Sequence, residues 1–93
     1  MEANTLFLTI KRKWFDKILS GEKTIEFREA KPHYYRVFKK QYSKILLQAG
    51  YSPTSPRLEA NIVLVEKKFI VFHEELFEME CYCIHLTNSI QIR

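Results

Sequence analysis

The sequence predicts a small α+β domain, built as a mixed β-barrel of five or six strands with one or two short helices. The length of 93 residues suits a single domain whose core needs neither metals nor disulfides. Hydrophobic residues make up 46% of the chain and aromatic residues 14%, which is typical of a folded protein. Strand-like segments recur, and no repeat, low-complexity tract or linker divides residues 1–93 into further domains.

The first helix is the most clearly marked element. Its apolar residues recur at helical spacing and form one stripe: Trp14, Phe15, Ile18 and Leu19. Gly21 follows them, and a glycine readily adopts the left-handed conformation that ends a helix. We therefore expect a first strand over 5–11 and a helix over 13–20.

Breakers and apolar spacing define the remaining elements. Pro32 interrupts the chain, and the aromatic residues after it are spaced three and four apart, which favours a short helix around 34–43. Segment 50–56 contains a glycine, two prolines and small polar residues, so we expect an irregular loop. The later predicted strands are 24–29, 44–48, 58–66 and 79–86, with 89–92 as the sixth if one forms.

A polar row follows the first helix. After Gly21 the period changes from 3.6 to 2, so Thr24, Glu26 and Arg28 share one face of a strand. Ile25 and Phe27 then point to the opposite face. This alternation predicts that the apolar pair faces the core and that the polar row is accessible to a ligand.

Lys23 extends the polar row at the corner between helix and strand. Residues two apart advance about 6.6 Å along a strand, so Glu26 and Arg28 can act on one small ligand, and Lys23 can swing over the same surface. Together these charges can bind a polar planar group. The alternative is a solvated strand face on which Glu26 pairs with Lys23 or Arg28 and contributes little.

The segment 6–29, LFLTIKRKWFDKILSGEKTIEFRE, resembles the ASCH family. The family pattern is G-x-K-x-x-E-x-R after a strand and a short helix, and four residues match it: Gly21, Lys23, Glu26 and Arg28. The likeness continues through AGYSP at 49–53, similar to a turn after the middle strand, and through YCIHLTNSIQI, similar to the closing strand. It covers most of the chain, and its specific part is the eight residues 21–28 with their flanks.

The resemblance implies a PUA-like barrel with a cleft beside the matched residues, and a function in binding RNA or nucleotides. Lys23 and Arg28 would hold phosphate or a carbonyl oxygen, while Glu26 would accept hydrogen bonds from an exocyclic amine or orient Lys23. Lys11, after the first strand, and Tyr51, in the proline-rich loop, are further ligand-binding candidates at the rim.

Two alternative functions stay open. A bacterial branch of the family hydrolyses the acetyl amide of acetylcytidine and carries a threonine where this chain has Glu26. An enzyme would use Lys23 with a lowered pKa, together with Thr24 as nucleophile or Glu26 as general base, to hydrolyse an amide or an RNA phosphodiester. The second alternative is a small protein-interaction module of the kind that phage genomes encode.

The net charge of +4 is unevenly distributed, because the first 57 residues are strongly basic and the rest are acidic. Basic residues interleaved with aromatics can clamp a nucleic-acid backbone and stack on bases. The expected nucleic-acid surface consists of Arg12, Lys13, Tyr35, Lys39 and Lys40. The alternative is that the aromatic residues belong to the core while the lysines keep the protein soluble.

No cofactor and no metal are expected. Cys81, Cys83 and His85 share one face of a strand but span about 13 Å along it, which is too far for the three side chains to converge on one zinc ion. The two cysteines lie too close in one strand for an ordinary disulfide. The chain shows neither a secretion signal pattern nor an apolar run of membrane-spanning length, so we expect a cytoplasmic protein without a membrane partner. The sequence does not predict the oligomeric state.

Overall fold

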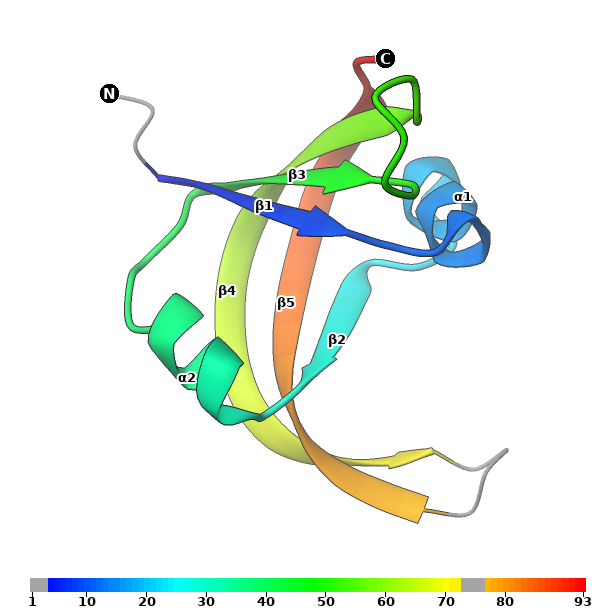
Figure 1. Ribbon diagram of the computed structural model, residues 1–93. Coiled ribbons are helices and arrows are strands. Elements are labelled where there is room, and N and C mark those ends of the chain that lie inside the picture. Colours follow the sequence, from blue (N-terminus) through cyan, green and yellow to red (C-terminus); the bar gives the residue numbers. More distant parts are fainter. Residues whose placement is uncertain (1–3, 73–76) are drawn as a thin grey trace.

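The computed structural model describes residues 4–72 and 77–93, which form a mixed five-stranded sheet and two helices (Figure 1). This confirms the α+β class. The elements are β1 (Thr5–Thr9), α1 (Arg12–Ser20), β2 (Ile25–Glu29), α2 (Pro32–Val37), β3 (Lys44–Gln48), β4 (Arg57–Phe72) and β5 (Phe77–Gln91).

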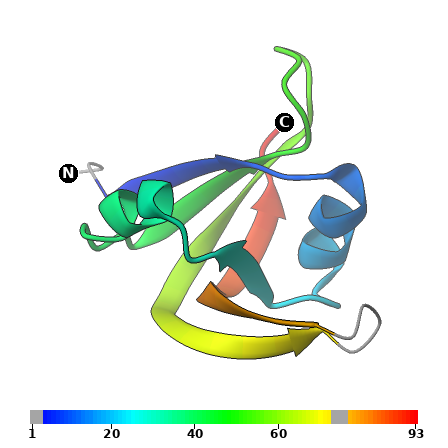
Figure 2. The same cartoon turned by 60° about the horizontal axis from the view of Figure 1, so that its bottom comes forward.

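The strand order in the sheet is β1-β3-β4-β5-β2. Strands β1 and β3 are parallel, and every other neighbouring pair is antiparallel. The sheet curls, so that the outer edges of β1 and β2 turn toward each other (Figures 1 and 2). These two edges do not pair, so the sheet is not closed and the predicted barrel is confirmed only as far as a curled mixed sheet.

Strands β4 and β5 are much longer than predicted, with 16 and 15 residues. The predicted strands 79–86 and 89–92 are parts of the single strand β5. Register shifts between Glu59 and Asn61 and between Ile62 and Leu64 mark two bulges in the β4–β5 pair, the first with its extra residue in β5 and the second in β4, and bulges let a long strand bend. Beyond the region that pairs with β3 and β2, the two strands continue as a curved two-stranded arm, visible at the bottom of Figure 1.

The helices form where local signals are strong. Gly21 ends α1 with a φ of 87°, and its N–H bonds to the carbonyl of Ile18, as expected for a left-handed cap. Pro32 occupies the first turn of α2, where its missing N–H costs nothing. Helix α2 ends at Val37, earlier than predicted, and residues 38–43 lead into β3 without helical structure.

Apolar residues from the sheet and α1 form the core. Ile45, Leu47, Leu58 and Ile84 are fully buried, and Phe15 from α1 packs with them. None of the helices in the described ranges is both long and apolar enough to span a membrane.

The predicted orientation of β2 is wrong. Glu26 is only 6% exposed, whereas Ile25 and Phe27 are half-buried and lie outside the core cluster. The polar row can face inward because Glu26 meets two cations there. Phe27 is covered on the other side, where its ring contacts that of Phe72 in the arm at 6.1 Å.

Candidate functional site

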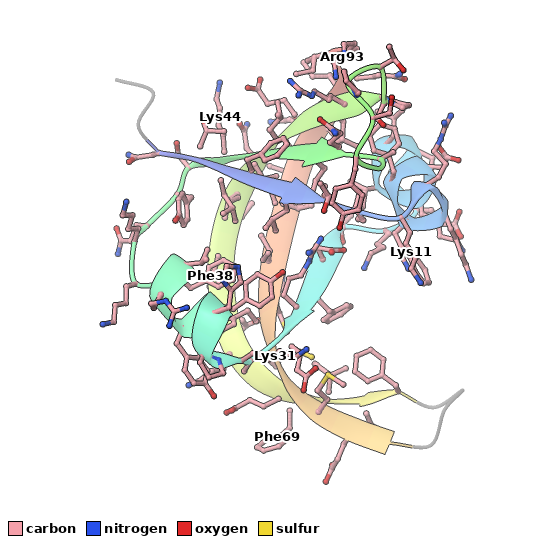
Figure 3. All side chains as sticks on the ribbon, in the orientation of Figure 1. Lys11, Lys31, Phe38, Lys44, Phe69 and Arg93 are labelled. Carbon is pink, nitrogen blue, oxygen red and sulfur yellow. The ribbon has the colours of Figure 1, made fainter. Side chains whose placement is uncertain are left out.

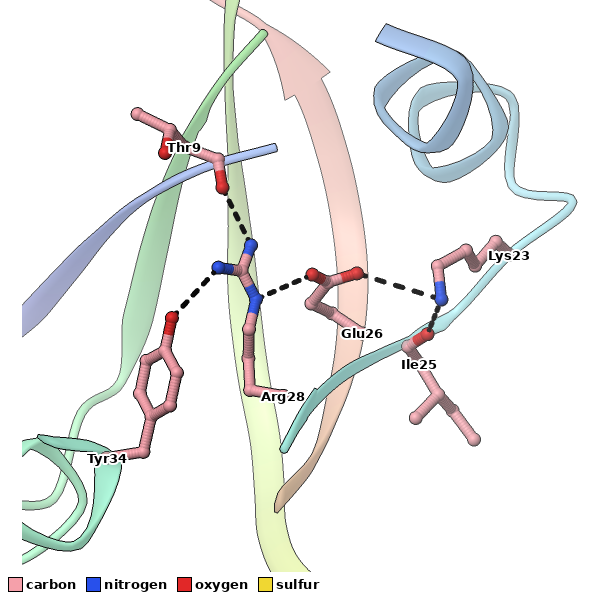
Figure 4. Close-up of polar contacts among 6 residues, drawn as sticks. All are labelled: Thr9, Lys23, Ile25, Glu26, Arg28 and Tyr34. Atoms are coloured by element: carbon pink, nitrogen blue, oxygen red, sulfur yellow. Dashed lines mark hydrogen bonds and ion pairs between the residues drawn. The ribbon is translucent and has the colours of Figure 1, made fainter. Parts of the chain in front are cut away.

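Glu26 lies between two cations in the interior of the curled sheet (Figure 4). Arg28 donates from Nε to Glu26 Oε2 at 2.8 Å, and Lys23 Nζ is 3.7 Å from Glu26 Oε1. The three side chains are between 8% and 18% exposed. The pairing that the sequence suggested therefore occurs, but it is a buried network and not a solvated surface.

Arg28 joins three elements of the fold. Its Nη2 donates to the carbonyl oxygen of Thr9 in β1 at 2.7 Å, and its Nη1 donates to the hydroxyl of Tyr34 in α2 at 3.1 Å. Burial by itself would lower the pKa of Arg28, but the Glu26 carboxylate and the Tyr34 hydroxyl outweigh it and raise that pKa. The guanidinium is thus a permanent cation that ties β2 to β1 across the open side of the sheet.

Lys23, unlike Arg28, lies among aromatic rings where it could contact a ligand. Its ammonium donates to the carbonyl oxygen of Ile25, and it lies 4.7 Å from the ring centroid of Phe27 and 5.6 Å from that of Trp14. Burial lowers the pKa of Lys23 below the ordinary 10.5; Glu26 partly offsets this effect and Arg28 reinforces it. Less energy is therefore needed to deprotonate Lys23 than to deprotonate an exposed lysine.

A hollow of about 590 Å³ opens beside Lys23, and we call it the Trp14 hollow. Its volume falls within the usual range for small-molecule sites. Apolar and aromatic side chains form its walls, and Lys23, Glu26 and Glu29 supply charge. The other lining residues are Trp14, Phe27, Ile70, Val71, Phe72, Met79 and Cys81. A flat ligand with polar edges could contact aromatic walls and an ion pair there at once.

Several predicted site residues lie outside this hollow. Arg28 is absent from its lining and is held by the network described above. Lys11 is exposed at the start of α1, and Tyr51 is 88% exposed in the loop after β3. Thr24 is exposed too, and its carbonyl accepts a hydrogen bond from the N–H of Leu86. The structure therefore brings Lys23, Glu26 and Arg28 together, but of the predicted set only Lys23 and Glu26 line the hollow.

The predicted nucleic-acid surface is divided between two places. Arg12 and Lys13 belong to α1, whereas Tyr35 belongs to α2 and is followed by Lys39 and Lys40. Figures 1 and 2 both show α1 and α2 on opposite sides of the molecule. Lys13 lies beside the site, because its ammonium is 4.7 Å from the ring centroid of Trp14.

A second hollow, of about 550 Å³, lies between β4 and the segment after α2. We call it the Phe38 hollow. Its lining residues are Phe38, Lys40, Gln41, Tyr42, Ile62, Val63, Leu64, Val65, Lys67 and Tyr82. Sequence reasoning missed both the arm residues that wall the Trp14 hollow and this second hollow. The apolar residues after Glu66 could have indicated that β4 continues.

The cysteine and histidine residues of β5 have separate environments. Cys81 and Cys83 are free thiols, 1% and 2% exposed, and burial raises the pKa of both. His85 Nε2 lies 2.7 Å from Glu66 Oε2. Within residues 4–72 and 77–93, no group of three potential metal ligands comes together.

Comparisons with models of known protein families, with curated proteins and with solved structures give no match for this chain.

Proposed function

We propose that this chain is a single ASCH/PUA-like domain that binds RNA or a nucleotide-like ligand in the Trp14 hollow. One observation carries the proposal. Lys23 and Glu26, two residues of the G-x-K-x-x-E-x-R pattern, stand together in a hollow with the aromatic rings of Trp14 and Phe27. Nucleic-acid bases have a flat apolar face and polar edges, which is the combination that such a hollow can recognise.

The charged pair supplies recognition of the polar edge. Lys23 donates to a carbonyl oxygen or a phosphate, and Glu26 accepts from an exocyclic amine while it orients Lys23. The base stacks against Trp14 or Phe27. Arg28 has a positioning role, because its contacts with Thr9, Tyr34 and Glu26 fix the place of the carboxylate.

The open sheet fits an incomplete PUA-like barrel. The edges of β1 and β2 approach each other without pairing, and the guanidinium of Arg28 connects them through the carbonyl of Thr9. In this proposal, the family arginine completes the barrel through its side chain where the backbone does not. Two free thiols and a nucleotide ligand are compatible with a cytoplasmic protein.

Salt-dependent RNA binding tests the proposal. The affinity for a short single-stranded RNA should fall steeply as salt is added, because binding releases counterions from phosphates. Lys13→Glu, in the predicted nucleic-acid surface and 4.7 Å from the ring centroid of Trp14, should weaken binding more than the control Lys44→Glu, on β3, whose side chain is 49% exposed. Equal affinity at low and high salt, or equal effects of the two changes, would contradict a phosphate-binding surface beside the Trp14 hollow.

The lowered pKa of Lys23 favours a second candidate, hydrolysis of an acylated cytidine or of an RNA phosphodiester. A lysine that loses its proton easily can act as a general base and accept the proton of a nucleophile. Thr24 is exposed and outside the Trp14 hollow, so the nucleophile would be water activated by Glu26. We expect weak or no turnover of acylated cytidines. Robust turnover that Lys23→Ala abolishes would establish the enzyme.

A further inference from the structure

The outer edge of β4 is exposed and carries large apolar side chains on both sides of a charged centre at 66–68. Strand β3 pairs with β4 only as far as Asn61, and within the described part of the chain no strand pairs with that edge along residues 63–71. Large apolar side chains are exposed there: Val63 65%, Leu64 47%, Phe69 69% and Val71 52%. Such an edge can pair with another strand, and because charged side chains protect an edge from non-specific pairing, the partner has to match the charges at 66–68.

We propose that the partner of this edge is a second copy of the chain, which adds its own β4 in antiparallel orientation around a two-fold axis at Lys67. In that register Glu66 lies opposite the partner's Lys68, and the same pair recurs across the axis. Val65 then lies opposite the partner's Phe69, and Leu64 opposite the partner's Ile70. Charges meet opposite charges, and apolar side chains meet apolar ones.

Neighbouring registers lack this match. An axis at Glu66 would place Glu66 opposite its own copy and Leu64 opposite the partner's Lys68. An axis at Lys68 would place Lys68 opposite its own copy and Glu66 opposite the partner's Ile70. All three registers place like charges opposite each other at the axis, but only the axis at Lys67 also pairs each flanking charge with an opposite charge and each flanking apolar residue with an apolar one, so the edge favours it.

Lys67 is the residue that meets its own copy, and its environment reduces the repulsion. Its ammonium lies 5.4 Å from the ring centroid of Tyr35 and 6.0 Å from that of Tyr82 in the same chain. These rings attract the ammonium toward its own subunit. The two Lys67 side chains can therefore face away from each other even though their backbones are neighbours.

The Phe38 hollow gives the pairing a reciprocal contact. Val65, Lys67 and Phe69 share one face of β4, since no register shift occurs after Leu64. The hollow lies along this edge and is lined by Phe38, Tyr42 and Val65, among others. Because the partner's Phe69 would stand opposite Val65, its ring can enter the hollow, and Phe69 of this chain can enter the partner's.

This arrangement explains two features with one contact. Phe69 lies at the bend of β4, far from Phe38 in the same chain (Figure 3), so it cannot fill its own hollow. A two-fold pair fills both hollows and uses both free edges, which closes the assembly at two subunits. The inference does not depend on the ligand proposed for the Trp14 hollow, although Ile70 belongs both to the wall of that hollow and to the proposed strand pair.

Charge exchange tests the register without nucleic acid. Glu66→Lys alone and Lys68→Glu alone each place like charges opposite each other. In sedimentation equilibrium at micromolar protein, each variant should therefore contain a larger fraction of monomer than the wild type. An equimolar mixture of the two variants should recover dimers, because the Glu66→Lys subunit then presents two lysines to two glutamates of the Lys68→Glu subunit. Recovery on mixing also shows that both variants are folded.

Phe69→Lys tests the contact with the Phe38 hollow, and Ile90→Lys is the matched control at another exposed position, 59% exposed on β5. Phe69→Lys should raise the dimer dissociation constant at least about tenfold, while the control should leave it near the wild-type value. A monomeric wild type at every concentration, a mixture that stays monomeric, or equal effects of Phe69→Lys and Ile90→Lys would overturn the proposal.

Discussion

Replacing Glu26 by glutamine tests whether the carboxylate is the buried centre of the site. Glu26 is 6% exposed and pairs with Arg28 at 2.8 Å and Lys23 at 3.7 Å. Removing one partner from a buried ion pair costs about 3–5 kcal/mol. The glutamine keeps one acceptor, worth about 1 kcal/mol, and Lys23 can shed its proton because its pKa is lowered.

We therefore expect Glu26→Gln to lower the free energy of unfolding by about 2 kcal/mol, which corresponds to a fall in Tm of about 8–16 °C for a domain of this size. Urea and thermal unfolding followed by circular dichroism would measure both quantities. The double variant with Lys23→Met should lose less stability than the sum of the single changes, since one uncompensated cation is removed.

Glu59→Gln is the matched control. Glu59 also lies on a strand and pairs with a lysine, Lys44, at 3.9 Å, but its side chain is 34% exposed. This exposed pair should contribute little, so the control should stay within about 0.5 kcal/mol of the wild type. If Glu26→Gln were as stable as Glu59→Gln, Glu26 would not be the centre of a buried network.

Three further outcomes follow from the geometry. Burial lowers the pKa of Lys23, so between that lowered pKa and 10.5 the unfolded chain holds a proton that the folded chain lacks. The stability of the wild type relative to Lys23→Met, measured by urea unfolding, should therefore rise with pH through this window. A stability difference that does not change with pH would contradict the burial of Lys23. Gly21→Ala should cost about 1 kcal/mol and Gly21→Asn less, since the φ of 87° is strained for alanine while no atom lies within 4 Å of an added Cβ; equal unfolding midpoints would show that the cap is relaxed. Cys81 and Cys83 should react with Ellman's reagent far more slowly in the native protein than in urea, because both thiols are buried and their pKa values are raised; fast native labelling would mean that β5 opens readily.

Local signals explain which parts of the fold the sequence could predict. The predicted strand 44–48 coincides with β3, and the predicted helix 13–20 differs from α1 by one residue. Both depend on neighbouring residues, and so does the cap at Gly21. The extra length of β4 and β5 depends on the pairing of these two strands with each other. The charged stretch at 66–68 led to a predicted end of β4 at residue 66, because a run of charges does not look like part of a strand.

The candidate site likewise has a part that the sequence could predict and a part that it could not. Alternation correctly separated the polar and apolar rows of β2, but it could not tell which row faces inward. That choice depends on the arm, which brings Phe72 to Phe27, and on Arg28 reaching Thr9 across the open sheet. The family-like motif did indicate Lys23 and Glu26, which line the Trp14 hollow together. The walls contributed by residues 70–72 could not be foreseen without the fold.

The fluorescence of Trp14 tests the proposed function most directly, because it is the only tryptophan in the chain and lines the hollow. Ribonucleoside monophosphates and a short single-stranded RNA would be titrated into the wild type, Lys23→Ala and Lys17→Ala. Lys17 is the matched control, since its ammonium lies 6.0 Å from the Trp14 ring but the residue does not line the hollow.

We predict saturable quenching in the wild type and in Lys17→Ala, and affinity at least about tenfold weaker in Lys23→Ala, whose folding circular dichroism would verify. No quenching by any of these ligands, or equal affinity of folded Lys23→Ala and the wild type, would contradict a nucleotide site in the Trp14 hollow.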